Sequence, residues 1–227
     1  MKSTLYNTGF PSARRALLLA CLLLPAVSRA ATLNWGSEIF STLVDSRGQT
    51  LDNRYQIELG AFAVDFVPDE TNIAQWRDHW YIFDTAEYNQ EFGYFTSTVE
   101  IGPDGKSDST SATPDAPSFE GKEMYLWIQD NAGAQPGSEW LLTRSATWVF
   151  NSISAECCDN EAPIEWSVSD LTELDTPVWG SQGGTAGGGD TTAPGVYTLQ
   201  THAVVPEPSA VLLITLAAGA GLVRRRR

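Results

Sequence analysis

The chain has 227 residues, enough for one ordinary domain, and a formal net charge of −14. Eight of its 14 basic residues lie among the first 30 or the last four positions, so the segment 31–205 holds 27 acidic residues against six basic ones, a formal charge of −21. A body this acidic repels nucleic-acid phosphates and anionic membrane surfaces, which argues against nucleic acid as a partner.

The first 30 residues predict a secretory signal peptide. A basic start with Lys2 precedes an apolar run over 16–27, and small side chains at 28 and 30 suit signal peptidase. We therefore expect export by the general secretion machinery and cleavage between Ala30 and Ala31. A retained anchor would need about 20 apolar residues, more than this run offers.

Short segments of strand character recur through the body between turn signals. In the segment 55–67, Ile57 and Leu59 share one parity and Phe62 has the other, so the change at Gly60 predicts a β-bulge. The other predicted strands cover 92–101, 124–129, 140–143, 147–150, 165–168 and 196–204. This pattern favours a mainly β fold over 31–204, an antiparallel β-sandwich-like single domain.

One segment departs from the strand pattern. Behind Thr71, which can cap a helix, four apolar residues recur at helical spacing, namely Ile73, Trp76, Trp80 and Phe83. We predict one short helix over 72–83 that packs this aromatic stripe on a sheet.

Two segments are predicted to be loops. The segment 103–121 is polar and contains prolines, and the segment 180–195 has seven glycines in 16 residues and no apolar period. Asp104 and Asp108 make the first loop a candidate calcium site, because calcium takes oxygen ligands. Lys106 occupies a ligand position of the EF-hand pattern, and acidic side chains that simply keep an exported protein soluble are the alternative.

The cysteines exclude a disulfide framework. Cys21 leaves with the signal peptide, and the mature chain keeps only the neighbours Cys157 and Cys158. Adjacent cysteines can close only a strained ring, so the fold must rest on its core. A vicinal disulfide, free thiols and a bond to another chain remain open for this pair, and a structural zinc site would need further ligands.

We predict no catalytic residues and no cofactor other than the candidate calcium. His79 and His202 are the two histidines, and no nucleophile motif surrounds either. A glycoside hydrolase needs only two carboxylates, which 27 acids can supply. The eight tryptophans suit either a core or the stacking faces of a carbohydrate-binding site.

The last 23 residues hold three elements in a fixed order. First come Pro206, Glu207 and Pro208, which stay extended because proline fixes φ and biases the residue before it. An apolar run over 210–223 follows and predicts a membrane helix of about 21 Å, short for a core of roughly 30 Å. Four arginines that should stay cytoplasmic complete the segment: Arg224, Arg225, Arg226 and Arg227.

This order resembles the PEP-CTERM sorting signal of exported proteins from Gram-negative, often biofilm-forming bacteria, over residues 205–227. The resemblance implies that exosortase, an integral membrane enzyme, reads the Pro206–Pro208 segment and cuts near it. It further implies transient anchoring in the inner membrane, followed by transfer to the cell surface or the extracellular matrix. A permanent single-pass anchor is the alternative.

We therefore expect a structural or adhesive, non-enzymatic surface or matrix protein. Two alternatives stay open: a carbohydrate-binding module for exopolysaccharide, with or without calcium, and a carboxylate-dependent glycoside hydrolase.

Overall fold

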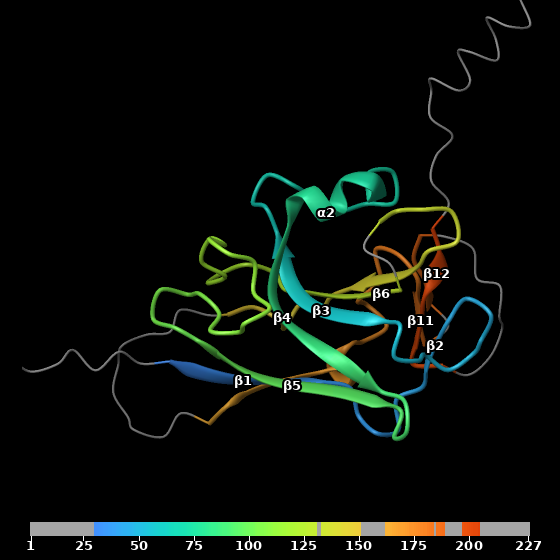
Figure 1. Cartoon of the computed structure of the whole chain (residues 1–227), viewed down its shortest axis with the longest axis horizontal. Coiled ribbons are helices and arrows are strands. Elements are labelled where there is room, and N and C mark those ends of the chain that lie inside the picture. The colour runs from blue at the N-terminus through green and yellow to red at the C-terminus, as the bar shows by residue number, and fades with distance from the viewer. Residues whose placement is uncertain (1–29, 131–132, 151–161, 184, 189–196, 205–227) are drawn as a thin grey trace, which may run out of the picture.

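The computed structural model describes residues 30–130, 133–150, 162–183, 185–188 and 197–204, and these residues form a mainly β fold with one short α-helix (Figure 1). This agrees with the expectation from sequence. Most of the signal peptide, the Cys157 and Cys158 pair and the whole sorting segment lie outside the described residues. Within them, no helix is both long and apolar enough to cross a membrane.

Among the described residues, eight strands form one curled sheet. In chain order they are β1 (Ala31–Gly36), β3 (Gln56–Phe62), β4 (Trp80–Asn89), β5 (Tyr94–Ile101), β6 (Tyr125–Gln129), β7 (Glu139–Thr143), β8 (Ile164–Ser167) and β12 (His202–Ala203). Their order across the sheet is β12-β7-β6-β3-β4-β5-β1-β8.

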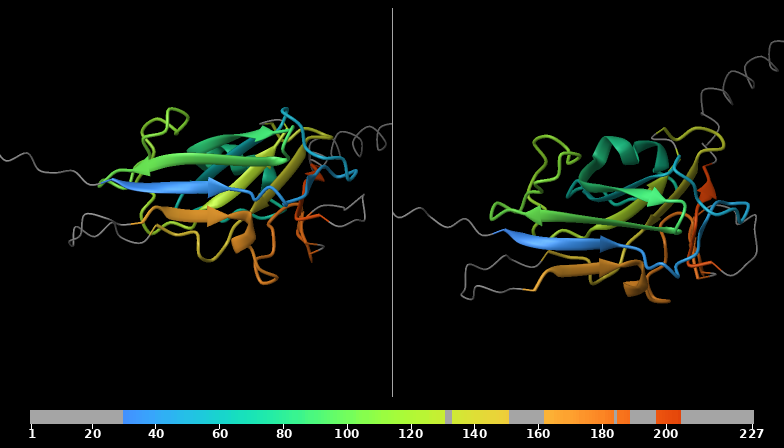
Figure 2. Two further views of the ribbon diagram at one scale, coloured as in Figure 1. Left: turned by 90° about the horizontal axis from the view of Figure 1, so that it is seen from below. Right: turned by 60° about the horizontal axis from the view of Figure 1, so that its bottom comes forward.

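A smaller sheet lies beside the β12 end of the large one (Figure 1). It consists of β2 (Leu43–Val44), β9 (Ser181–Gln182), β10 (Thr185–Ala186) and β11 (Leu199–Gln200), in the order β10-β9-β11-β2. Most pairings in both sheets are antiparallel, but β1 pairs with β8 and β2 pairs with β11 in parallel. Figure 2 shows blue β1 between green β5 and orange β8.

Six of the seven predicted strands are present, as β3, β5, β6, β7, β8 and the pair β11 and β12. The strand predicted for 147–150 is not formed, because this segment makes only isolated bridges, such as Glu123 with Val149. Five observed strands were not predicted: β1, β2, β4, β9 and β10.

The predicted helix exists but is shorter than expected. A 3-10 turn, η1 (Ile73–Gln75), leads into α2 (Trp76–His79), and β4 begins at Trp80. The helix ends there because Trp80 enters the sheet as the partner of Phe62 in β3. Thr71 does not cap it. Instead, the Asp69 carboxylate accepts the backbone N–H groups of Thr71 and Asn72 and fixes the turn before η1.

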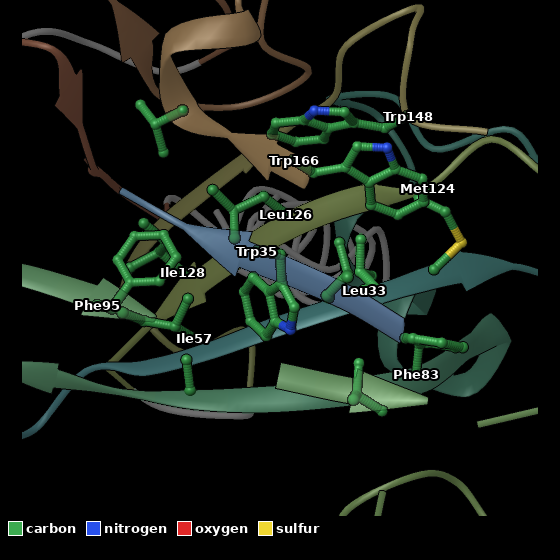
Figure 3. Close-up of a cluster of buried hydrophobic side chains, with 14 of the residues drawn as sticks. Leu33, Trp35, Ile57, Phe83, Phe95, Met124, Leu126, Ile128, Trp148 and Trp166 are labelled. Atoms are coloured by element: carbon green, nitrogen blue, oxygen red, sulfur yellow. The ribbon is translucent and has the colours of Figure 1, made fainter. Parts of the chain in front are cut away.

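The large sheet is buried on both faces over β3 and β6. One face carries Ile57 and Leu59 into a hydrophobic cluster that also holds Leu33, Trp148 and Trp166 (Figure 3). The opposite face carries a second cluster beneath η1 and α2, made mainly of Phe62, Trp76, Trp80, Tyr125, Trp127 and Trp140. Because side chains alternate along a strand, β3 supplies both clusters.

The register between β3 and β4 shifts beside Gly60, where a bulge was predicted, but β3 keeps an unbroken register with β6 through Gly60, so the bulge lies in β4 and not in β3. The shift leaves Phe83 as the extra residue of β4. Because side chains alternate along a strand and Phe83 lies three residues after Trp80, Phe83 joins the first cluster and Trp80 the second. The apolar stripe predicted for one helix is thus divided between two faces of a sheet.

The prediction of a plain loop for the glycine-rich segment 180–195 is wrong in the part that the structure describes. Residues 181–182 and 185–186 form β9 and β10, and Gly188 bridges to Trp179. A Cβ atom on Gly188 would lie 2.8 Å from the Trp179 ring, and one on Gly180 would lie 2.6 Å from Leu141. Here glycine permits close packing of the backbone against large side chains. The segment 103–121 is a loop, as predicted.

We predict that Gly60→Ala lowers the free energy of unfolding by about 1–3 kcal/mol, the usual cost of overpacking. The added Cβ would lie 2.3 Å from the carbonyl oxygen of Tyr81 and 2.6 Å from the Trp80 ring. Urea denaturation measures this loss. Gly102→Ala is the matched control, because its Cβ would approach most closely the end of the exposed Asp104 side chain. Equal losses in the two variants would contradict the packing argument.

Candidate functional site

The structure gives Asp104 and Asp108 local roles in their loop. The Asp104 carboxylate accepts the Lys106 backbone N–H at 3.1 Å, and the Asp108 carboxylate accepts the Glu100 N–H at 2.8 Å. Both aspartates are exposed. Within the described ranges, no group of three or more His, Cys, Asp or Glu residues could hold a metal ion. Calcium binding therefore stays a prediction.

Both histidines are built into packing contacts. His79, at the end of α2, stacks on Phe66 with ring centroids 4.2 Å apart. His202 is fully buried in β12, with its Nδ1 3.0 Å from the carbonyl oxygen of Gly188.

All eight tryptophans are buried, none more than 7% exposed. Two of them, Trp148 and Trp166, stack on each other within the first cluster (Figure 3). The tryptophans thus serve the core, and a sugar would have to be held by other side chains.

The most unusual side chain of the second cluster is the buried carboxylate of Glu58. It lies in β3 between two core residues, on the face covered by α2, and only 4% of the residue is exposed. Burying a charge is costly unless partners surround it. Three side chains from α2, β4 and β6 supply those partners: Arg77, Trp80 and Gln129.

Both Glu58 oxygens are fully engaged. Oε1 accepts from Gln129 Nε2 at 2.9 Å and from Arg77 Nη1 at 3.2 Å. Oε2 accepts from Trp80 Nε1 at 2.7 Å and from the same Arg77 nitrogen at 3.0 Å. A carboxylate oxygen offers about two acceptor positions, so the Glu58 carboxylate has no free acceptor position.

Arg77 also contacts a tryptophan of the second cluster. Its guanidinium lies 4.4 Å from the centre of the Trp127 ring, a cation–π contact that supports the charge on its apolar side. Four buried polar atoms around this contact find no hydrogen-bond partner in the described part of the chain: Arg77 Nε and Nη2, Trp127 Nε1 and Gln129 Oε1. The side chains around Glu58 thus carry hydrogen-bonding groups that the neighbouring described residues do not satisfy.

A pocket of about 710 Å³ opens on the same face, over β3 and β4. Its polar lining comes from both strands, from the turn before β3 and from the loop 103–121: Asn53, Gln56, Glu58, Thr85, Glu87 and Ser111. Ile82 adds aliphatic surface, and Tyr55 and Tyr88 also border the pocket, although both are buried in the first cluster. In the register of β3 with β4, Gln56 lies opposite Glu87 and Glu58 lies opposite Thr85, so four polar side chains form one patch.

Comparison of the chain with models of known protein families, with curated proteins and with solved structures gives no match.

Sequence reasoning named none of the pocket residues as a site. A glutamate between Ile57 and Leu59 is the signal it could have used, because the alternation predicts that Glu58 lies on the face opposite the apolar one. Its partners could not be found in this way. Gln129 follows Glu58 by 71 residues and meets it only because β3 pairs with β6.

A second buried carboxylate, Glu139 in β7, joins the large sheet to the small one. It accepts from the backbone N–H of Ser46 at 3.1 Å and from the Thr201 hydroxyl at 2.9 Å. Tyr55, at one end of the pocket, lies near it. Burial raises the pKa of the Tyr55 phenol well above its ordinary value of 10, and the Glu139 charge raises it further.

We predict that this phenol makes stability fall in alkali. A pKa raised by folding contributes stability that is fully present below pH 10, the unfolded value, and is lost as pH rises further. Each such group changes the free energy of unfolding by at most about 1.4 kcal/mol per pH unit. Urea denaturation between about pH 9 and 11 measures the fall, which should be shallower in Tyr55→Phe. An unchanged slope would contradict the assignment, whatever the variant's stability at neutral pH.

Proposed function

We propose that this chain is an exported protein of the bacterial surface or extracellular matrix, sorted through residues 205–227 by exosortase. The observation that carries the proposal is the order of Pro206–Pro208, the apolar run 210–223 and the four terminal arginines. Under this proposal the segment acts as a substrate of the sorting enzyme, which releases the body after transient anchoring in the inner membrane.

The body is proposed to be structural or adhesive and non-enzymatic, on a sandwich-like β scaffold. A carboxylate-dependent hydrolase needs an acid and a base or nucleophile that can reach the sugar. In the pocket over β3 and β4, Glu58 has all its acceptor positions occupied, which leaves Glu87 as the other lining carboxylate. This arrangement supports binding over hydrolysis.

The acidity of the body supports an extracellular role. With 27 acidic and six basic residues in the segment 31–205, copies of the protein repel one another and stay soluble outside the cell. Divalent cations could bridge such surfaces, with Asp104 and Asp108 as the candidate ligands.

Deleting residues 206–208 should leave the protein in the inner membrane with its C-terminus intact, because the proposed recognition segment is gone. Cell fractionation with mass spectrometry of the C-terminal peptide checks this. A deletion of equal length at residues 190–192, in the glycine-rich segment, is the control and should still be processed. Surface delivery of the 206–208 deletion with an unchanged C-terminus would refute the sorting proposal.

A further inference from the structure

We propose that the pocket over β3 and β4 binds a neutral, hydroxyl-rich sugar unit of an extracellular polysaccharide. This inference deepens the proposed function. It rests on that proposal in one respect, namely that the protein works among extracellular polysaccharides. It is carried by the size, lining, charge and rigidity of the pocket.

The pocket has the size and lining of a sugar site. Its volume of about 710 Å³ falls within the roughly 300–1,000 Å³ typical of small-ligand sites. Amides at Asn53 and Gln56 and hydroxyls at Thr85 and Ser111 can each donate and accept hydrogen bonds. Sugar hydroxyls need such partners, because every one of them is also both donor and acceptor. Ile82 offers apolar surface to the C–H groups of a sugar ring.

Charge selects against anionic sugars. The ionisable lining residues other than the two tyrosines are Glu58 and Glu87, and among the described residues that line the pocket none is basic. Arg77 compensates Glu58, but its charge is bound to that carboxylate. A uronic acid or sulfated sugar would therefore meet Glu87 and a strongly acidic body without a cation to pair with.

The walls of the pocket are fixed before any ligand arrives. In the register of the sheet, β4 pairs with β5 only through Tyr88 and Asn89, so the first part of β4 is left for the loop 103–121. Thr113 fastens this loop to β4. Its N–H donates to the Ile82 carbonyl at 3.0 Å, and its hydroxyl accepts the Ile82 N–H at 2.8 Å.

A buried aspartate holds the Ser111 side of the loop. The Ser111 hydroxyl lies 2.8 Å from that of Ser109, which donates to the Asp84 carboxylate at 2.6 Å. Asp84 in turn accepts from Trp35 Nε1 at 2.8 Å in the first cluster. Rigid walls lower the conformational entropy that the protein must lose when a ligand binds.

A buried polar atom without a hydrogen-bond partner among the residues that the structure describes lies next to the pocket, on one of the side chains that contact Glu58. Gln129 is the register partner of Gln56 and is fully buried, yet its Oε1 has no partner among the described residues. Such a group costs free energy unless an ordered water satisfies it.

The full chain is expressed, and the protein is purified from whichever cell fraction contains it. Binding can therefore be measured even if sorting fails. Isothermal titration calorimetry with cellohexaose, maltohexaose and mannohexaose should detect binding to at least one of these neutral sugars. An alginate hexamer, which is anionic, should bind more weakly than that sugar. Failure of all three neutral sugars, or stronger binding of alginate or of a cationic chitosan hexamer, would overturn the proposal.

Variants of Thr85 localise the site. Thr85→Val removes one hydroxyl with little change of shape and should weaken binding about fivefold. Thr85→Tyr should abolish binding by filling the pocket. Thr96→Val and Thr96→Tyr are the matched controls, since Thr96 is exposed on β5 and does not line the pocket. Undiminished binding by folded Thr85→Val, or equal losses at the two positions, would place the sugar elsewhere.

Discussion

The buried carboxylate of Glu58 is the point at which strand, helix and pocket meet. Its position in β3 places a charge among core residues, and a buried charge must be satisfied by donors. Trp80 supplies one from the first residue of β4, Gln129 supplies one from β6, and Arg77 supplies the cation from α2. A helix of four residues has almost no stability of its own, so tertiary contacts must hold α2 in place. The ion pair between Glu58 and Arg77 is the polar part of that attachment, and the aromatic contacts below it are the apolar part.

Burial on both faces then explains the rest of the large sheet. The chain builds a first cluster from the aliphatic side of β3 and β6 and a second, tryptophan-rich cluster from the other side, closed by η1 and α2. The α2 cover stops at Arg77 and Glu58, and beyond it the same face of β3 and β4 is open. The pocket lies there, with Gln56, Thr85 and Glu87 on its floor. An uncovered polar face next to a rigid core is a suitable place for a binding site, because the core fixes the side chains that contact a ligand.

Much of the fold could be predicted from the sequence, because alternating strands such as Met124 to Gln129 leave local signals. The helix was predicted too long for a physical reason. Trp80 and Phe83 are three residues apart, which suits one face of a helix, but in β4 this odd spacing puts them on opposite faces of a sheet. The partners of Glu58 could not be predicted, since Arg77, Trp80 and Gln129 follow it by 19, 22 and 71 residues and meet it only in the folded chain, from α2, β4 and β6. The sorting proposal depends instead on Pro206 to Pro208 and the residues after them, where order along the chain carries the information and no tertiary contact is needed.

The central claim is that Glu58 and Arg77 act as one buried unit that holds α2 on the sheet, and a double-mutant cycle tests it most directly. The free energy of unfolding would be measured by urea denaturation for Glu58→Gln, Arg77→Met and the double variant. Arg77→Met should cost about 2–3 kcal/mol, because it leaves a buried charge unpaired, and the coupling between the two positions should reach at least about 1 kcal/mol. The exposed pair Asp52 and Arg54, tested as Asp52→Asn and Arg54→Met, is the matched control and should show weaker coupling. Coupling between positions 58 and 77 no larger than in this surface pair would contradict the account.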